Sequence, residues 1–141
     1  MTDTTTDPTT TGDSTADDNT ARRTRAIDAH LRAYCEPDAE LRADLVAKAW
    51  TPAGVLVDPP FDGAGHDGIS AMADGVLVHY PAHRFERTTE VDAHHAFARY
   101  GWSLVAPDGT VAVTGTDVVE FGDDGRLARV VGFFGDPVPA A

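Results

Sequence analysis

The chain has 141 residues, of which 42% are hydrophobic, and its formal net charge at neutral pH is −12. This length suits one domain with a hydrophobic core, and the acidic surface would repel nucleic acid and anionic membranes, so neither is an expected partner. The single cysteine, Cys35, excludes an internal disulfide and a cysteine-based metal cluster.

The first twenty residues consist mainly of threonine and aspartate, with no basic residue and no apolar run. Such a segment buries too little apolar surface to fold, and it lacks the features of a signal peptide. We predict a disordered acidic tail over residues 1–20 and a single domain over residues 21–141. Because no later apolar stretch approaches the length that spans a bilayer, we expect a soluble, cytoplasmic protein.

Three amphipathic helices are predicted next. The first runs from Thr20 to Pro37, and its inward face has residues at helical spacing, namely Ile27, His30, Leu31, Tyr34 and Cys35. The second follows the capping residue Asp38, and its predicted buried stripe is Leu41, Leu45, Val46, Ala49 and Trp50. The third covers residues 65–80, after the short strand "GVLVDPP", and its inward residues are Ile69, Met72, Ala73, Val76 and Leu77.

The second half of the chain reads as strands. Segments 83–92, 93–105, 110–121 and 126–135 are rich in β-branched and aromatic residues, and the turns "APDG" and "GDDG" join the last three into an antiparallel meander. Helices followed by a curled antiparallel sheet indicate an α+β fold. The helices can cover the concave face and leave a pocket at its open end, where polar side chains are candidates for chemistry.

Asp117 stands inside the predicted strand 110–121. Alternation gives it the same-side neighbours Val113, Gly115, Val119 and Phe121. A carboxyl group on this apolar face would be desolvated and could stay protonated at neutral pH. Alternatively, Asp117 faces outward or pairs with Arg99 or Arg129 and is structural, and alternation alone leaves both interpretations open.

Asp58 ends the predicted strand in "VLVDPP", at what would be the mouth of the pocket. It is a second candidate for a functional carboxylate. An aspartate before proline is also a common way to leave a strand, with its side chain bonded to nearby backbone amides. Both interpretations are kept for Asp58.

Adjacent histidines occur at positions 94 and 95. Alternation places His94 on one face with Tyr100 and Trp102, and His95 on the other, so we expect at most one of them, His94, in the pocket. A pocket histidine beside Asp58 would suit dehydratase, epoxide-opening or cyclisation chemistry, whereas a satisfied or exposed side chain would be structural. No metal site is predicted, because adjacent histidines in a strand point apart.

Residues 24–137 resemble the NTF2-like superfamily, named for nuclear transport factor 2, which includes SnoaL-like polyketide cyclases and ketosteroid isomerases. The resemblance rests on motifs in the same order along the chain: "KAW", "GVLVDPP", "GAGHDGI" and "GTDVVEFGDDGRLARVVGFFG". It implies a cone-shaped fold, with three N-terminal helices packed on a strongly curved, mostly antiparallel sheet, and a homodimer formed through the convex face.

The isomerase pattern further implies roles for individual residues. Its catalytic base falls on Asp58 and its protonated oxyanion-hole aspartate on Asp117, while its helix tyrosine falls on either Tyr34 or His30. In ketosteroid isomerase an apolar site keeps that second carboxyl group neutral, so that it can donate a hydrogen bond. The implied enzyme moves a proton at a carbon next to a carbonyl group, as an isomerase or cyclase, without a cofactor or metal.

The implied ligand is a small apolar or polycyclic molecule that carries a carbonyl group. Candidate ligand-contacting residues are apolar or aromatic, namely Trp50, Tyr100, Trp102, Val119 and Phe134. The alternative is a non-catalytic binding or dimerisation module whose aspartates are structural. A deep apolar pocket that both carboxyl groups reach would favour the enzyme, and a pocket filled by Trp102 and Tyr100 would favour the module.

Overall fold

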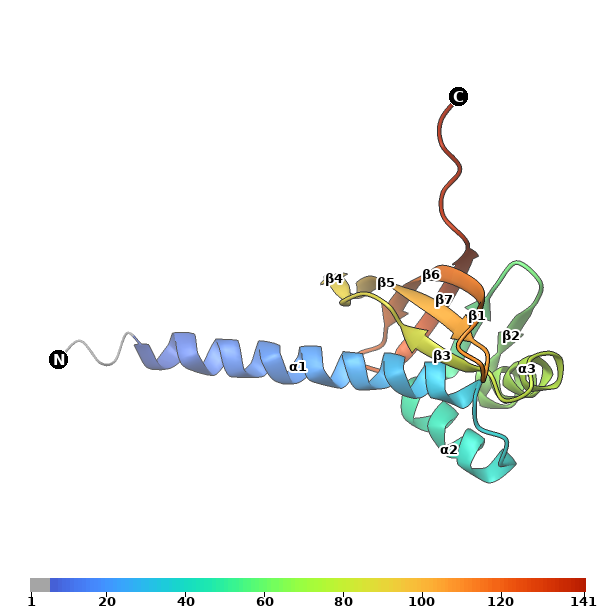
Figure 1. Cartoon of the computed structure of the whole chain (residues 1–141). Helices are drawn as coiled ribbons and strands as arrows, with labels where there is room; N and C mark the ends of the chain where they lie inside the picture. Colours follow the sequence, from blue (N-terminus) through green and yellow to red (C-terminus); the bar gives the residue numbers. More distant parts are fainter. Residues whose placement is uncertain (1–5) are drawn as a thin grey trace.

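The computed structural model describes residues 6–141, with side chains from residue 15 onward. Within these residues the fold is α+β, with three helices and one mixed sheet (Figure 1). The helices are α1 (Thr6–Ala33), α2 (Ala39–Ala49) and α3 (Gly65–His79). Helix α2 begins where expected, because Oδ1 of Asp38 accepts hydrogen bonds from the backbone N–H groups of Glu40 and Leu41 at 2.9 and 3.1 Å.

The sheet contains seven strands in the described part of the chain. They are β1 (Trp50–Val57), β2 (Asp62–Ala64), β3 (Arg84–Arg87), β4 (Asp92–His94), β5 (Phe97–Val105), β6 (Val111–Phe121) and β7 (Leu127–Phe134). Their spatial order is β2-β1-β7-β6-β5-β3, and β4 pairs with β5 beside β3. The meander β5-β6-β7 is antiparallel as predicted, whereas β1 joins β7 in parallel and makes the sheet mixed.

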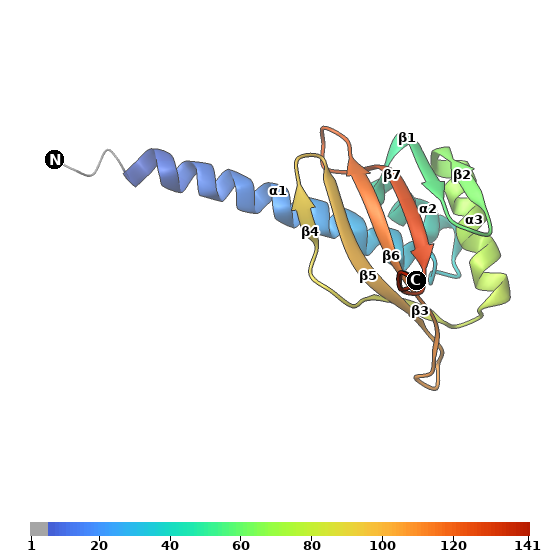
Figure 2. The same ribbon diagram turned by 90° about the horizontal axis from the view of Figure 1, so that it is seen from above.

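The helices lie against one face of the curved sheet (Figure 2). Helix α1 packs on α2, and α3 packs on β1. Side chains from the helices and from the concave face of the sheet form one hydrophobic core, whose fully buried members include Ile27, Val46, Trp50, Leu56, Ile69, Leu127 and Val130. This cone-shaped, NTF2-like arrangement is the fold that the sequence predicts.

Helix α1 is longer than predicted and projects beyond the sheet (Figure 1). It begins at Thr6 instead of Thr20, and among its described side chains, from residue 15 onward, the first buried one is Ala26. The prediction of a tail considered only whether the segment could bury apolar surface. A helix that is already nucleated by packing further along can extend without burial, because each added residue gains one backbone hydrogen bond. Residues 1–5 of the predicted tail lie outside the described part.

Two details of α2 also differ from the sequence prediction. Leu41 is 52% exposed instead of buried, and Trp50 is the first residue of β1 instead of the last of the helix. Trp50 is nevertheless fully buried. Among the described residues, no helix is long and apolar enough to cross a bilayer.

Candidate functional site

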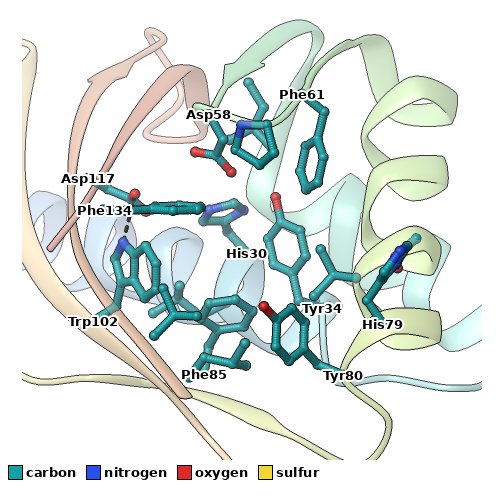
Figure 3. Close-up of a pocket in the computed structure, with 17 residues that line it drawn as sticks. His30, Tyr34, Asp58, Phe61, His79, Tyr80, Phe85, Trp102, Asp117 and Phe134 are labelled. Atoms are coloured by element: carbon teal, nitrogen blue, oxygen red, sulfur yellow. Dashed lines mark hydrogen bonds and ion pairs between the residues drawn. The ribbon is translucent and has the colours of Figure 1, made fainter. Parts of the chain in front are cut away.

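A cavity of about 560 Å³ opens between the helices and the concave face of the sheet (Figure 3). Most of its wall is apolar, and it is lined by no lysine or arginine of the described chain. The lining residues are His30, Leu31, Tyr34, Leu56, Asp58, Pro60, Phe61, Gly75, Val76, His79, Tyr80, Phe85, Trp102, Leu104, Val113, Asp117 and Phe134. A cavity of this size, walled by apolar side chains with a few converging polar groups, has the character of a small-molecule site.

Asp117 faces the interior and is 4% exposed. The hydroxyl of Tyr100 donates to its Oδ2 at 2.7 Å, and Nε1 of Trp102 donates to its Oδ1 at 2.9 Å. Both donors come from β5, where Tyr100 pairs directly with Asp117. Of the two arginines named as alternative partners, Arg99 binds the exposed Asp92 at 2.8 Å, and neither Arg99 nor Arg129 is among the described partners of Asp117. Asp117 is therefore a buried carboxyl group whose two oxygens each have a donor, as such a group requires.

His30 lies beside this carboxyl group. Its Nε2 is 3.8 Å from Oδ2 of Asp117, and its Nδ1 has no hydrogen-bond partner among the described residues. The ring packs edge-on against Tyr34 and Trp50, with centroid distances of 5.2 and 5.3 Å. His30 therefore presents an unused polar atom in a largely apolar environment.

Tyr34 follows His30 by four residues and lies directly after the last residue of α1, and both side chains face inward. Its hydroxyl is buried and has no hydrogen-bond partner within residues 6–141. Burial, and to a lesser degree the charges of Asp58 and Asp117, raise the pKa of Tyr34 well above its usual value. The phenol consequently keeps its proton and is available as a donor to a bound molecule.

Asp58 closes the polar end of the cavity, where β1 ends. The backbone N–H of Asp58 donates to the carbonyl of Phe61 at 2.9 Å, which holds the turn, while the side chain lines the cavity. Burial raises the pKa of Asp58 to about 6, the charge of Asp117 adds to this rise, and His30 opposes it. The turn interpretation and the functional interpretation thus both apply, the first to the backbone and the second to the carboxyl group.

Figure 3 shows the Asp58 carboxyl, the His30 ring and the Tyr34 hydroxyl directed toward the same region of the cavity, with Asp117 at its side. The sequence left open whether Tyr34 or His30 would face the pocket, and the structure places both there. Trp102 and Phe134 also line the cavity, as proposed. The polar end of the site thus comes from α1, β6 and the end of β1.

Four of the candidates lie elsewhere. Tyr100, Val119 and Trp50 are buried in the layer behind the cavity, where Tyr100 binds Asp117 and Trp50 supports the His30 ring. His94 is exposed on β4, with its Nδ1 3.1 Å from Nδ1 of His95. The expectation that His94 enters the pocket was wrong, because a tight turn separates it from β5 and alternation does not continue across that turn.

Three aromatic residues of the cavity wall were missed from the sequence. Phe85, Phe61 and Tyr80 line the cavity from β3, from the loop after β1 and from the end of α3. Only Phe85 had a usable signal, since it is the one apolar residue in "RFER". In the described part of the chain, no group of three or more histidine, cysteine, aspartate or glutamate side chains is placed to hold a metal ion.

Comparison with solved structures gives related folds. A candidate isomerase of the SnoaL-like family from Agrobacterium tumefaciens strain C58 is 36% identical, with a TM-score of 0.76, over 82% of this chain and 99% of that chain. An NTF2-like protein from Exiguobacterium sp. 255-15 is 16% identical, with a TM-score of 0.63, over 79% of this chain and 99% of that one.

A protein with a ketosteroid isomerase-like fold from Catenulispora acidiphila, in complex with trimethylamine, is 10% identical, with a TM-score of 0.62, over 77% and 83% of the two chains. At these lower identities the last two comparisons show the fold alone. No family model and no curated protein matches the sequence.

Proposed function

The chain belongs to the SnoaL-like family, and from that premise we propose that it catalyses proton transfer at a carbon next to a carbonyl group. The substrate would be a small apolar molecule bound in the cavity, and the reaction an isomerisation or a cyclisation. One observation carries the proposal: the Asp58 carboxyl and the Tyr34 hydroxyl reach the same end of an apolar cavity. Neither side-chain group has a hydrogen-bond partner within the described residues, so both are available to a bound molecule.

Asp58 is the proposed base. A pKa of about 6 leaves most of the carboxyl groups ionised at neutral pH, yet makes them more basic than an ordinary aspartate. General-base catalysis is most effective when the pKa of the base lies near the working pH. Asp58 would remove the proton next to the carbonyl group. In an isomerisation it would return this proton to another carbon of the same molecule. In a cyclisation the enolate carbon would instead bond to a second carbonyl carbon of that molecule, whose C=O π bond breaks, and the proton would go to the resulting alkoxide oxygen.

Tyr34 is the proposed donor to the enolate oxygen that forms when the proton leaves. Its raised pKa keeps the hydroxyl protonated, and the surrounding apolar wall strengthens a hydrogen bond to a developing negative charge. The resemblance assigns a donor role to Asp117 as well. Each oxygen of Asp117, however, already accepts a hydrogen bond, from Tyr100 or from Trp102. The hydroxyl of Tyr34 has no such partner, so it can donate to the enolate oxygen more simply.

Asp117 has a second proposed role that does not need a proton. Its charge contributes to the raised pKa of Asp58. It lies next to His30, which lowers the pKa of Asp58. The two residues would therefore adjust the basicity of Asp58, whose pKa is raised first of all by burial. Tyr100 and Trp102 hold the carboxyl group of Asp117 in place from the neighbouring strand.

The experiment that tests this function is α-proton exchange in deuterated water, followed by proton NMR with 2-tetralone as an enolisable, apolar ketone. The protein should accelerate exchange, and Asp58→Asn should lower the rate at least 100-fold, because general bases typically contribute about 10²- to 10⁴-fold. Asp44→Asn, at an exposed position on α2, is the matched control and should keep the rate. Ligand binding without acceleration would favour the non-catalytic binding module instead.

We also propose that the convex face of the sheet is covered by a second copy of the chain, as the resemblance implies. Large apolar side chains that are exposed on the central strands β5, β6 and β7 include Phe97, Val118 and Phe133, at 45%, 41% and 57%. Light scattering should give twice the chain mass, and Val118→Asp should reduce it to one chain. A single-chain mass for the unaltered protein would contradict this proposal.

A further inference from the structure

Gly132 lies in β7 between the two strands that carry the carboxyl groups. In the antiparallel pair β6–β7 it stands directly opposite Asp117. In the parallel pair β1–β7, Val57 is the partner of Val131, so Asp58 and Gly132 are the next residues along these two neighbouring strands. The three positions therefore form a row across the concave face, with a residue that lacks a side chain in the middle.

A side chain at position 132 would collide with the site. A Cβ atom built there would overlap Oδ1 of Asp58, and it would lie 3.1 Å from Cγ of Asp58 and 3.2 Å from Oδ1 of Asp117. All three are carboxyl atoms, and none belongs to the backbone. Gly132 itself lies within a regular strand and has no left-handed backbone conformation, so chain geometry does not demand glycine here.

We propose that Gly132 is a positioning residue: the space left by its missing side chain is where the Asp58 carboxyl lies, turned inward over the sheet toward Asp117 and the cavity. Its part in catalysis rests on the function proposed above. Its part in placing Asp58 does not, because it follows from the contacts alone. A methyl group at this position would push the carboxyl group out toward solvent and away from Asp117.

This displacement has a measurable electrostatic consequence. The groups that face Asp58 are Asp117 from β6, His30 from α1 and Tyr34 directly after α1. Burial and the Asp117 charge raise the pKa of Asp58 to about 6, and both effects weaken as the carboxyl group moves outward. The pKa of Asp58 in Gly132→Ala should therefore fall toward the ordinary aspartate value of about 3.9.

The test compares the protein with Gly132→Ala by carbon NMR titration of the side-chain carboxyl groups. The midpoint of Asp58 should fall by at least about one pH unit, and 2-tetralone exchange at pH 7 should slow by roughly 10- to 100-fold, because misplacing a reacting group by about 1 Å can cost about 100-fold. The matched control is Gly101→Ala on β5, where the three atoms nearest to an added Cβ belong to the side chains of Thr88 and Thr89 and to the carbonyl group of Gly115, and none belongs to the site. It should change neither quantity.

The outcomes separate the two proposals. A shifted midpoint in a protein that never accelerates exchange would overturn the proposed function and support the positioning role of Gly132. An unshifted midpoint, with the exchange rate kept within twofold, would overturn the positioning role and leave the function standing.

If Gly132→Ala folds poorly, its melting temperature is compared in two backgrounds. In an Asp58→Ala background the colliding carboxyl group is gone, so Gly132→Ala should lower the melting temperature only slightly. An equal loss in both backgrounds would mean that the backbone itself requires glycine, and the positioning role would be refuted.

Discussion

Replacing Asp58 by asparagine should make the protein more stable at neutral pH relative to the unaltered chain, and this advantage should shrink at pH 4. Burial and the Asp117 charge raise the pKa of Asp58 from 3.8 to about 6. Between these values the folded chain holds a proton that the unfolded chain has released. The stability of the Asp58 protein therefore falls as pH rises from about 4 to about 6 and stays lower above that window.

The size of this effect follows from the same pKa values. A rise from 3.8 to about 6 corresponds to about 3 kcal/mol at ~1.36 kcal/mol for each pH unit. Asp58 is only half-buried, and solvent screening reduces the figure to about 1.5 kcal/mol. For a chain of this length, that equals a change of about 5 °C in melting temperature, at roughly 3 °C for each kcal/mol.

The difference in melting temperature between Asp58→Asn and the unaltered chain is measured by thermal unfolding, followed by circular dichroism at pH 4 and pH 7.5. The buried amide of asparagine has its own packing cost, but that cost is the same at both pH values, so the difference between them isolates the ionisation of Asp58. Asp44→Asn corrects for the general effect of removing one negative charge from an acidic protein. A melting-temperature difference that does not change with pH, or that grows toward pH 4, would refute the electrostatic account of the site.

Three further predictions concern single side chains. Tyr34→Phe should keep the melting temperature within about 2 °C and slow 2-tetralone exchange by roughly 100-fold, as expected for loss of one oxyanion donor; an unchanged rate would remove Tyr34 from the mechanism. Tyr100→Phe should lower the free energy of unfolding by about 1.5 to 3 kcal/mol in urea denaturation, because the buried Asp117 carboxyl loses a donor at 2.7 Å; a loss below ~0.5 kcal/mol would argue against that hydrogen bond. His94→Ala should leave the exchange rate unchanged, since His94 is exposed on β4, and a slower rate would return it to the site.

The sequence predicted the inward face of β6 correctly because the strand is long and regular. Gly115, Asp117, Val119 and Phe121 are all buried, so period-two alternation holds over the whole segment. The helical spacing of four likewise predicted that His30 and Tyr34 face the same way, and both line the cavity although α1 ends at Ala33. In both cases the signal is local, and a single element decides which way the side chain points.

The failures occurred where two elements meet. His94 and Phe97 are partners across a turn that contains His95 at a φ of 54°, so the alternation of β5 cannot be extended back to His94. The hydrogen bonds of Tyr100 and Trp102 to Asp117 depend on the register between β5 and β6, which no single segment encodes. The wall formed by Phe61 and Tyr80 depends on the packing of α3 against the sheet.

The parallel pairing of β1 with β7 joins residues that are far apart in the chain. Strands β5, β6 and β7 are connected by short turns, whereas Val57 and its partner Val131 lie far apart in the sequence, with α3 and five strands between β1 and β7. Contacts of such long sequence separation require closure of a long loop and tend to form late. We expect hydrogen-exchange pulse labelling during refolding to protect β6 before β1. Asp58, at the end of β1, would then reach Asp117 only in the last folding step, so that a partly folded chain has a sheet but no site.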